Sequence, residues 1–190
     1  MPNSKSRPVG FGYVDGSNVF VAGMQYAAAR RGFAPSAHEA AVHRMADPSW
    51  RCNFRALHEL MFPPTCAEGQ AVIFGSYGEP GTAVWEHPAQ YAGFTVDLLR
   101  RNAHNREKQV DSALTTMMLT DIRYMRPERG DIVTLVSGDS DLVRPVQALQ
   151  KAGVKVRVRS WEHAASRELI ATADEYIPLD PHFNELTYTA

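Results

Sequence analysis

The sequence predicts an α/β fold, a three-layer α/β/α arrangement with a central, mainly parallel sheet of about five to six strands. Short β-rich apolar runs alternate with longer segments of helical periodicity along the chain. At 190 residues, the chain has the length of one ordinary domain. Hydrophobic residues make up 44% of it and charged residues 22%, which is the usual balance of a globular protein.

The apolar runs that predict strands end in turn-forming residues. The first ends at Asp15-Gly16, and the fourth continues into Ser137-Gly138-Asp139. The expected strands are residues 11–14, 70–77, 94–99, 131–136 and 154–158, with 175–179 as a possible last strand.

The segments between these strands have helical spacing and helix-end signals. Ser36 with Glu39 matches a capping box, and Gly32 and Gly153 stand where helices should end. The expected helices are residues 19–31, 37–46, 50–61, 83–91, 110–125, 142–152 and 164–172. Residues 100–108 are polar and basic, so we expect a loop there.

The chain is expected to form one domain at residues 11–180, with an N-terminal tail at 1–10 and a C-terminal tail at 181–190. Residues 19–62 are long for one connection between strands. A helical insertion at about residues 32–62 is therefore expected beside the sheet.

Composition narrows the class of protein. Lys and Arg number 20 and Asp and Glu 21, so the formal net charge is −1, and binding of phosphates over the whole surface is not indicated. Cys52 and Cys66 form no CxxC pattern, which argues against a disulfide framework or a structural zinc site. Neither a signal peptide nor an apolar run long enough to cross a membrane is found, so we expect a cytoplasmic protein without a membrane partner.

Four aspartates are expected at one edge of the sheet. In open parallel sheets, ligands bind beyond the carboxyl ends of the strands. Asp15 follows the first strand, Asp139 and Asp141 follow the fourth, and Asp111 begins the long helix after the third. Polar companions accompany them: Ser17, Asn18 and Ser137. Because crowded carboxylates are costly unless a cation neutralises them, this pattern predicts a site for Mg²⁺ or Mn²⁺.

Each acid also has a purely structural interpretation. Asp15-Gly16 alone is most often a turn, Asp111 suits the first turn of a helix, and Asp139 or Asp141 suits a helix cap. Only the joint placement of the acids favours a functional site. The sequence contains no GxSxG elbow and no glycine-rich phosphate loop, so a serine nucleophile or nucleotide binding is not indicated.

A group of basic residues precedes Asp111. It is either a solvated loop or a phosphate-binding rim, and it includes Arg100, Arg101, Arg106 and Lys108.

In four stretches, the chain resembles the NYN family of the PIN-like nuclease superfamily. They are YVDGSNVF at residues 13–20, REKQVDSAL at 106–114, VTLVSGDSDLVRPVQALQKAGVKVRV at 133–158 and SRELIATADEYIPL at 166–179. The combination is specific, although VDGSN alone would not be. Gln109 stands where the family commonly has Gly.

The resemblance implies a PIN-like fold and a ribonuclease that depends on Mg²⁺ or Mn²⁺. Asp15, Asp111, Asp139 and Asp141 match the acidic metal site of the family, and Asn18, Ser137 and Lys108 match its companion polar and basic residues. RNA is then the expected substrate, bound with help from Ser17, Ser137, Lys108, Arg106 and Arg101. PIN-like domains often pair, so a homodimer is a further expectation.

Two other functions stay open. The chain can be a non-catalytic NYN module that binds RNA or protein, or a nuclease that acts on DNA. In the leading hypothesis, Asp15, Asp139 and Asp141 are the main metal ligands and Asp111 orients a metal or its water. Asn18 and Ser137 then hold waters or the scissile phosphate.

Overall fold

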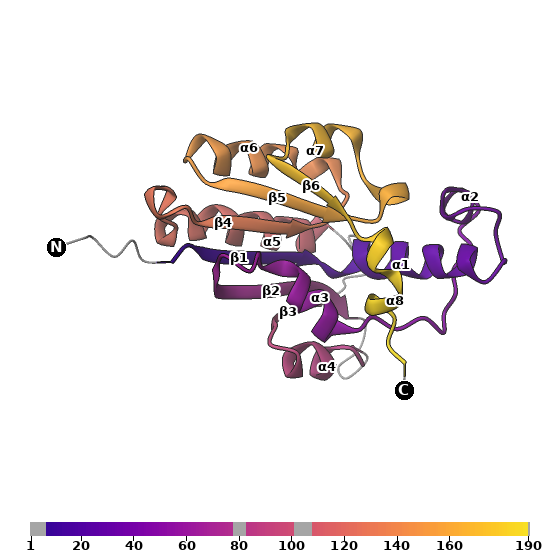
Figure 1. Cartoon of the computed structure of the whole chain (residues 1–190). Coiled ribbons are helices and arrows are strands. Elements are labelled where there is room, and N and C mark those ends of the chain that lie inside the picture. Colours follow the sequence, from indigo (N-terminus) through magenta and orange to yellow (C-terminus); the bar gives the residue numbers. More distant parts are fainter. Residues whose placement is uncertain (1–6, 78–82, 101–107, 190) are drawn as a thin grey trace.

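The structure is a computed structural model that describes residues 7–77, 83–100 and 108–189. It contains a six-stranded sheet in which every pair of neighbouring strands is parallel. The strand order is β3-β2-β1-β4-β5-β6, so the chain builds outward in one direction from β1 and in the other from β4 (Figure 1). The strands are β1 (Val9–Asp15), β2 (Ala67–Tyr77), β3 (Thr95–Arg100), β4 (Ile132–Val136), β5 (Lys155–Ser160) and β6 (Glu175–Pro178). All six expected strands are therefore confirmed.

Helices cover both faces of the sheet and produce three layers. The helices are α1 (Gly16–Arg30), α2 (Ala37–Val42), α3 (Phe54–Met61), α4 (Glu86–Tyr91), α5 (Lys108–Asp121), α6 (Val143–Lys151), α7 (Arg167–Thr172) and α8 (Phe183–Leu186). The apolar residues of α5, α6 and α7 share one buried cluster with alternate residues of the strands, among them Tyr13 and Leu135. The other residues of the same strands, such as Val14 and Val136, are buried with α1, α3 and α8. The predicted α/β/α architecture is confirmed.

The alternation of side chains along β1 and β4 decides where the polar residues at their ends lie. Successive residues of a strand face opposite sides of the sheet. Asp15 continues the series of Tyr13, and Ser137 continues the series of Leu135, so both belong to the face that α5 covers.

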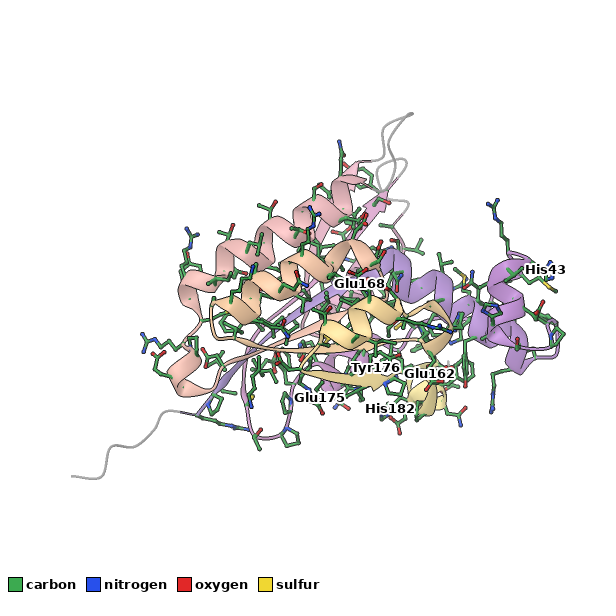
Figure 2. The ribbon with its side chains drawn as sticks, turned by 90° about the horizontal axis from the view of Figure 1, so that it is seen from above. His43, Glu162, Glu168, Glu175, Tyr176 and His182 are labelled. Carbon is green, nitrogen blue, oxygen red and sulfur yellow. The ribbon has the colours of Figure 1, made fainter. Side chains whose placement is uncertain are left out.

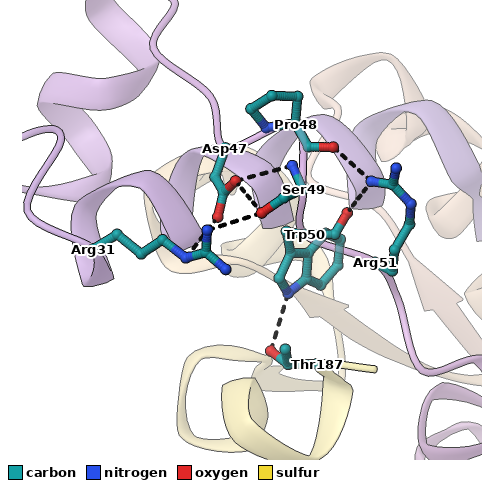
Figure 3. A network of polar contacts seen from close by, with 7 residues as sticks. All are labelled: Arg31, Asp47, Pro48, Ser49, Trp50, Arg51 and Thr187. Atoms are coloured by element: carbon teal, nitrogen blue, oxygen red, sulfur yellow. Dashed lines mark hydrogen bonds and ion pairs between the residues drawn. The ribbon is translucent and has the colours of Figure 1, made fainter. Parts of the chain in front are cut away.

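The insertion at residues 32–62 contains α2 and α3, and both are shorter than predicted. A polar network holds the connection between them in a non-helical path (Figure 3). The buried Asp47 accepts hydrogen bonds from Ser49 N at 2.9 Å and Ser49 Oγ at 2.7 Å, and its Oδ2 lies 3.0 Å from Arg31 Nε. Asn53 Oδ1 then accepts from Ala56 N at 3.3 Å and begins α3. Such side-chain bonds to nearby backbone compete with helix formation and explain the late start of α3. The early end of α2 has another cause: Arg44 has a left-handed φ of 53°, and Met45 N donates to Ala40 O at 2.8 Å.

Several other helices differ from the prediction at one or both of their ends. The helix predicted at 110–125 is α5 followed by the 3₁₀ turn η1 (Ile122–Tyr124), and the helix predicted at 142–152 is the turn η3 (Ser140–Leu142) followed by α6. The helix predicted at 164–172 begins only at Arg167, because Ser166 Oγ accepts from Leu169 N at 3.4 Å and caps it. Short 3₁₀ turns at helix ends satisfy backbone groups without altering the apolar periodicity, so the periodicity does not reveal them.

The first half of the segment expected as a C-terminal tail, residues 181–190, is folded onto the domain. Residues 180–186 form the turn η5 (Asp180–His182) and α8, and Leu186 is buried. Leu186 O accepts from Asn53 N at 2.8 Å. Figure 3 shows a second contact, in which Thr187 Oγ1 accepts from Trp50 Nε1 at 3.0 Å. A helix of one turn has too little periodicity to be found in a sequence, and its contacts with the insertion are long-range.

The last strand is held to the sheet by side chains as well as by its backbone. Glu175 Oε2 lies 2.8 Å from Arg157 Nε of β5, and Tyr176 Oη donates to Ser160 O at 3.4 Å; Figure 2 labels Glu175 and Tyr176 on this edge strand. Within the described ranges, no helix has the length and apolar character needed to cross a bilayer.

Candidate active site

Asp15 is the most buried acid at the carboxyl edge of the sheet, with 3% of its surface exposed. It is the last residue of β1 and caps α1. Its Oδ1 accepts from Ser17 Oγ at 2.9 Å and from Asn18 N at 3.1 Å, and its Oδ2 accepts from Ser137 Oγ at 3.1 Å. The side chain is therefore fixed by groups from both β1 and the end of β4.

The turn after β4 is joined to the turn after β1 by two further bonds. Gly138 N donates to Asn18 Oδ1 at 3.0 Å, and Asp139 N donates to Ser137 Oγ at 3.2 Å. Asn18 and Ser137, which were expected to hold waters or phosphate, are thus occupied in holding the two turns together. The hypothesis that they also contact substrate stays a prediction.

Gly138 is a requirement of this turn that the sequence analysis missed. A Cβ atom added there would clash with the carbonyl of Ala164 and lie 2.8 Å from Ser160 Oγ. Because the clash is with backbone, no side-chain movement relieves it. The only signal in the sequence is the glycine itself within SGDSD, and glycines are common in turns that carry no site.

The other three acids are more open to solvent. Asp139 Oδ1 accepts from Asp141 N at 2.9 Å and caps η3, while Asp139 is half-buried and Asp141 exposed. Asp111 lies in the first turn of α5. Asp111 and Asp141 line one pocket of about 290 Å³, together with Ser112 and Thr115.

The structure thus gathers the four acids as two pairs. The charge of Asp139 acts on Asp15, and Asp111 shares a pocket with Asp141. Across the described residues, no group of three or more His, Cys, Asp or Glu side chains lies close enough together to hold a metal ion. The capping interpretation holds for Asp139, which accepts from Asp141 N, and Asp111 lies in the first turn of its helix as its structural interpretation predicts. Asp15 is the N-cap of α1, where only a turn was expected.

The side chains of the predicted basic rim lie outside the described residues. Arg101 and Arg106 lie outside the described residues, and so does the side chain of Lys108, although its backbone begins α5. Arg100 ends β3, and its side chain is likewise outside them.

The pKa of Asp15 is raised above its ordinary value. Burial is the largest cause; the hydrogen bonds from Asn18, Ser17 and Ser137 lower the pKa, and the negative charge of Asp139 raises it. A carboxyl group whose pKa is higher in the folded chain stabilises the fold below its unfolded pKa, and this contribution is lost as the pH rises through the folded pKa. Above its folded pKa, the ionised Asp15 therefore costs free energy of folding unless a cation lies beside it.

Asp15→Asn is accordingly expected to raise the Tm of the metal-free protein at pH 7 by a few degrees. Asparagine keeps an oxygen for Ser17 and Asn18 and removes the buried charge. The measurement is calorimetric or fluorescence-monitored unfolding of both proteins in EDTA. A Tm below that of the parent would show that the carboxylate is stabilised by its surroundings and needs no cation.

The donor chemistry of the site fits a hard divalent cation. Mg²⁺ commonly binds through one or two carboxylates and keeps several waters, so a full cage of protein ligands is not required. Asp15 and Asp139 offer carboxylate oxygens of this kind, and the pocket of Asp111 and Asp141 adjoins the same end of the sheet, because η3 contacts α5.

Comparisons with known proteins agree with this architecture. The model of the NYN domain family matches residues 13–180. A crystal structure of a protein of unknown function from Vibrio parahaemolyticus is similar to this chain, with a TM-score of 0.66 and 19% sequence identity over 99% of this chain and 100% of that one. At this identity, the similarity supports the fold alone. No curated protein matches the chain.

Proposed function

Because the chain belongs to the NYN domain family, within the PIN-like nuclease superfamily, we propose that it is a metal-dependent ribonuclease that hydrolyses RNA phosphodiester bonds. Family membership indicates a nuclease-type function. Our proposal goes further in three respects: it names RNA as the substrate, Mg²⁺ or Mn²⁺ as the metal, and the four aspartates as the site.

The observation that carries the proposal is the buried carboxylate of Asp15 beside Asp139. β1 and β4 are neighbours at the point where the strand order of the sheet reverses, which is where open parallel sheets bind ligands. Among the described residues, no Lys or Arg forms an ion pair with Asp15. A buried carboxylate next to a second acid, without a basic partner, is stabilised by a bound cation.

The residues of the site then have distinct roles. Asp15 and Asp139 would hold the metal, with Asp141 completing its surroundings and Asp111 orienting a metal-bound water. The bound ion would lower the pKa of a water and neutralise charge on the phosphate. Ser17, Ser137 and Asn18 keep Asp15 and the turn after β4 in place, since each forms a hydrogen bond there.

The phosphate backbone of the substrate would be bound by the basic residues ahead of Asp111. Arg101, Arg106 and Lys108 precede Asp111, which lies in the first turn of α5. Lys and Arg in such a position neutralise phosphates without reading sequence.

One observation favours the alternative of a non-catalytic module that binds RNA or protein. The four acids form two pairs, and the described residues contain no set of three metal-binding side chains in close proximity. Direct metal titration by calorimetry separates the alternatives, because the proposal requires a metal that binds the parent and not the double variant Asp15→Asn, Asp139→Asn.

The substrate class is tested by parallel digestion of single-stranded RNA, single-stranded DNA and duplexes of both, with Mg²⁺ present. We expect the single-stranded RNA to be cut fastest. Faster cutting of either DNA substrate would replace the ribonuclease proposal with a deoxyribonuclease. Metal binding without cleavage of any substrate would support the binding module.

A further inference from the structure

An apolar pocket of about 820 Å³ lies on the face of the sheet that α1 covers. Its walls come from four stretches that are far apart in the sequence. They are Phe20 and Met24 in α1, residues 50–55, residues between 84 and 92, and Tyr188.

One end of this pocket lies near the end of β1. Phe20 follows Asp15 by five residues, and a Cβ added to Gly16 would lie 3.3 Å from the Phe20 ring. The Trp85 indole packs directly on the backbone of Gly75 in β2. Phe74 precedes Gly75 in β2, and it pairs with Asp15 of β1. The pocket therefore lies near the end of β1 on the α1 side of the sheet, whereas Asp15 belongs to the α5 side, and a bound strand would pass over the carboxyl edge between them.

The walls of the pocket are aromatic and partly open. The rings of Phe54 and Trp85 lie nearly parallel, with an interplanar angle of 24° and centroids 6.3 Å apart, and Phe20 meets Trp85 edge-on at 5.3 Å. At the rim, the Tyr91 side chain is 97% exposed and that of Tyr188 is 59% exposed. Exposed aromatic side chains beside a cavity can stack on a ligand that has flat apolar groups.

The charges on the pocket wall are positive. Arg51 and Arg55 line it, and no described Asp or Glu does. Two carbonyl groups hold the Arg51 guanidinium, those of Pro48 at 2.6 Å and Trp50 at 3.0 Å (Figure 3). Arg55 pairs with Glu59 at 3.2 Å, but both side chains are well exposed, so solvent screens this pair. The preferred ligand is thus an anion that also carries flat rings.

We propose that this pocket binds an unpaired nucleobase of the strand that is cut at the acids; the proposal rests on the ribonuclease function proposed above. Bases stack on aromatic side chains whatever their identity, and Arg neutralises the neighbouring phosphates. A base within a duplex is stacked and paired, so it is not available to the pocket. The substrate is therefore single-stranded RNA or an unpaired segment of a structured RNA.

The test uses Tyr91→Ala, with Tyr124→Ala as its matched control. Tyr91 is almost fully exposed, so its loss does not endanger the fold; Tyr124 is an exposed tyrosine of η1 that does not line the pocket. Two labelled probes are compared by fluorescence anisotropy: a single-stranded RNA and an abasic ribose-phosphate strand of the same length. EDTA is present, so binding is measured without metal-dependent cleavage.

The parent should bind the RNA more tightly than the abasic strand. Tyr91→Ala should weaken RNA binding about fivefold or more and leave binding of the abasic strand unchanged. Tyr124→Ala should change neither by more than about twofold.

Equal RNA affinity of the Tyr91→Ala variant and the parent would overturn the proposal, and so would an equal loss for both probes. A dimer that Tyr91→Ala dissociates in light scattering, with unchanged RNA binding, would identify the pocket as an interface between copies of the chain and also overturn it. The two proposals fail separately: cleavage without an effect of Tyr91→Ala removes only the base pocket, and base-dependent binding without cleavage removes only the nuclease.

Discussion

Asp139→Asn is expected to lower the rate of RNA cleavage by at least about a thousandfold while the fold is preserved. The asparagine oxygen can still accept from Asp141 N, so the cap of η3 survives. What is lost is the negative charge beside Asp15. A metal ion contributes several kcal/mol to the stabilisation of the transition state, and each 1.36 kcal/mol corresponds to a factor of ten in rate.

A matched control for this variant is Glu128→Gln. Glu128 is an exposed acid of the turn η2 (Pro127–Arg129), next to the opposite end of β4. Its substitution removes one negative charge far from the site and should leave the rate within about twofold. Single-turnover cleavage of a labelled single-stranded RNA measures both, and unfolding curves verify that both variants fold. Cleavage by Asp139→Asn at the rate of the control would exclude Asp139 from the site.

Asp131→Ala is expected to destabilise the protein by about 2–4 kcal/mol, because two part-buried backbone amides lose their hydrogen-bond acceptor. The carboxylate is buried and bonds to both Nε and Nη2 of Arg129 at 2.6 Å. It also accepts from Val9 N and Arg126 N, each at 2.9 Å. In the variant, these two amides lose their acceptor, one at the start of β1 and the other just before the turn η2. In a domain of this size, the expected fall in Tm is roughly 4–16 °C.

Glu128→Ala, three residues away, is the control for this loss of stability and should change it by no more than about 0.5 kcal/mol. Denaturant unfolding at pH 7 measures both variants. A loss below about 1 kcal/mol for Asp131→Ala would show that water replaces the carboxylate at little cost.

The effect of Asp131 should depend on pH. Burial opposes its ionisation, but the bonds from Arg129, Val9 N and Arg126 N outweigh burial and hold its pKa below the ordinary value of 3.8. Such a group stabilises the fold above its unfolded pKa, and the contribution is lost as the pH falls through the folded pKa. The difference between the parent and Asp131→Ala should therefore be fully present at pH 7 and decrease as the pH falls from about 3.8 through the lower, folded pKa.

The sequence alone was sufficient for the sheet and for the end of the sheet that carries the acids. Buried parallel strands are short apolar runs, and the residues that follow them must lie at one edge. Asp15, Ser137 and Asp139 were found in this way, and the structure connects them by hydrogen bonds and charge.

The details that sequence reasoning missed depend on distances between segments remote in the chain. Nothing in the spacing of Asp111 and Asp141 shows that they face a pocket of their own, separate from Asp15. The aromatic pocket is equally hidden, because Phe20, Trp85 and Tyr188 come from three separate stretches. Apolar periodicity indicates which face of a helix is buried. It does not indicate which aromatic rings line a cavity.

The most direct test of the proposed metal-dependent nuclease is cleavage of one labelled single-stranded RNA by the purified protein in Mg²⁺, Mn²⁺ or EDTA, beside Asp139→Asn purified in the same way. The proposed function predicts cutting with either metal, none in EDTA, and restoration when metal is added back in excess. The variant should be inactive throughout, which also excludes a contaminating nuclease. Cutting that persists in EDTA, or equal cutting by the variant, would contradict a metal-dependent site built on these aspartates.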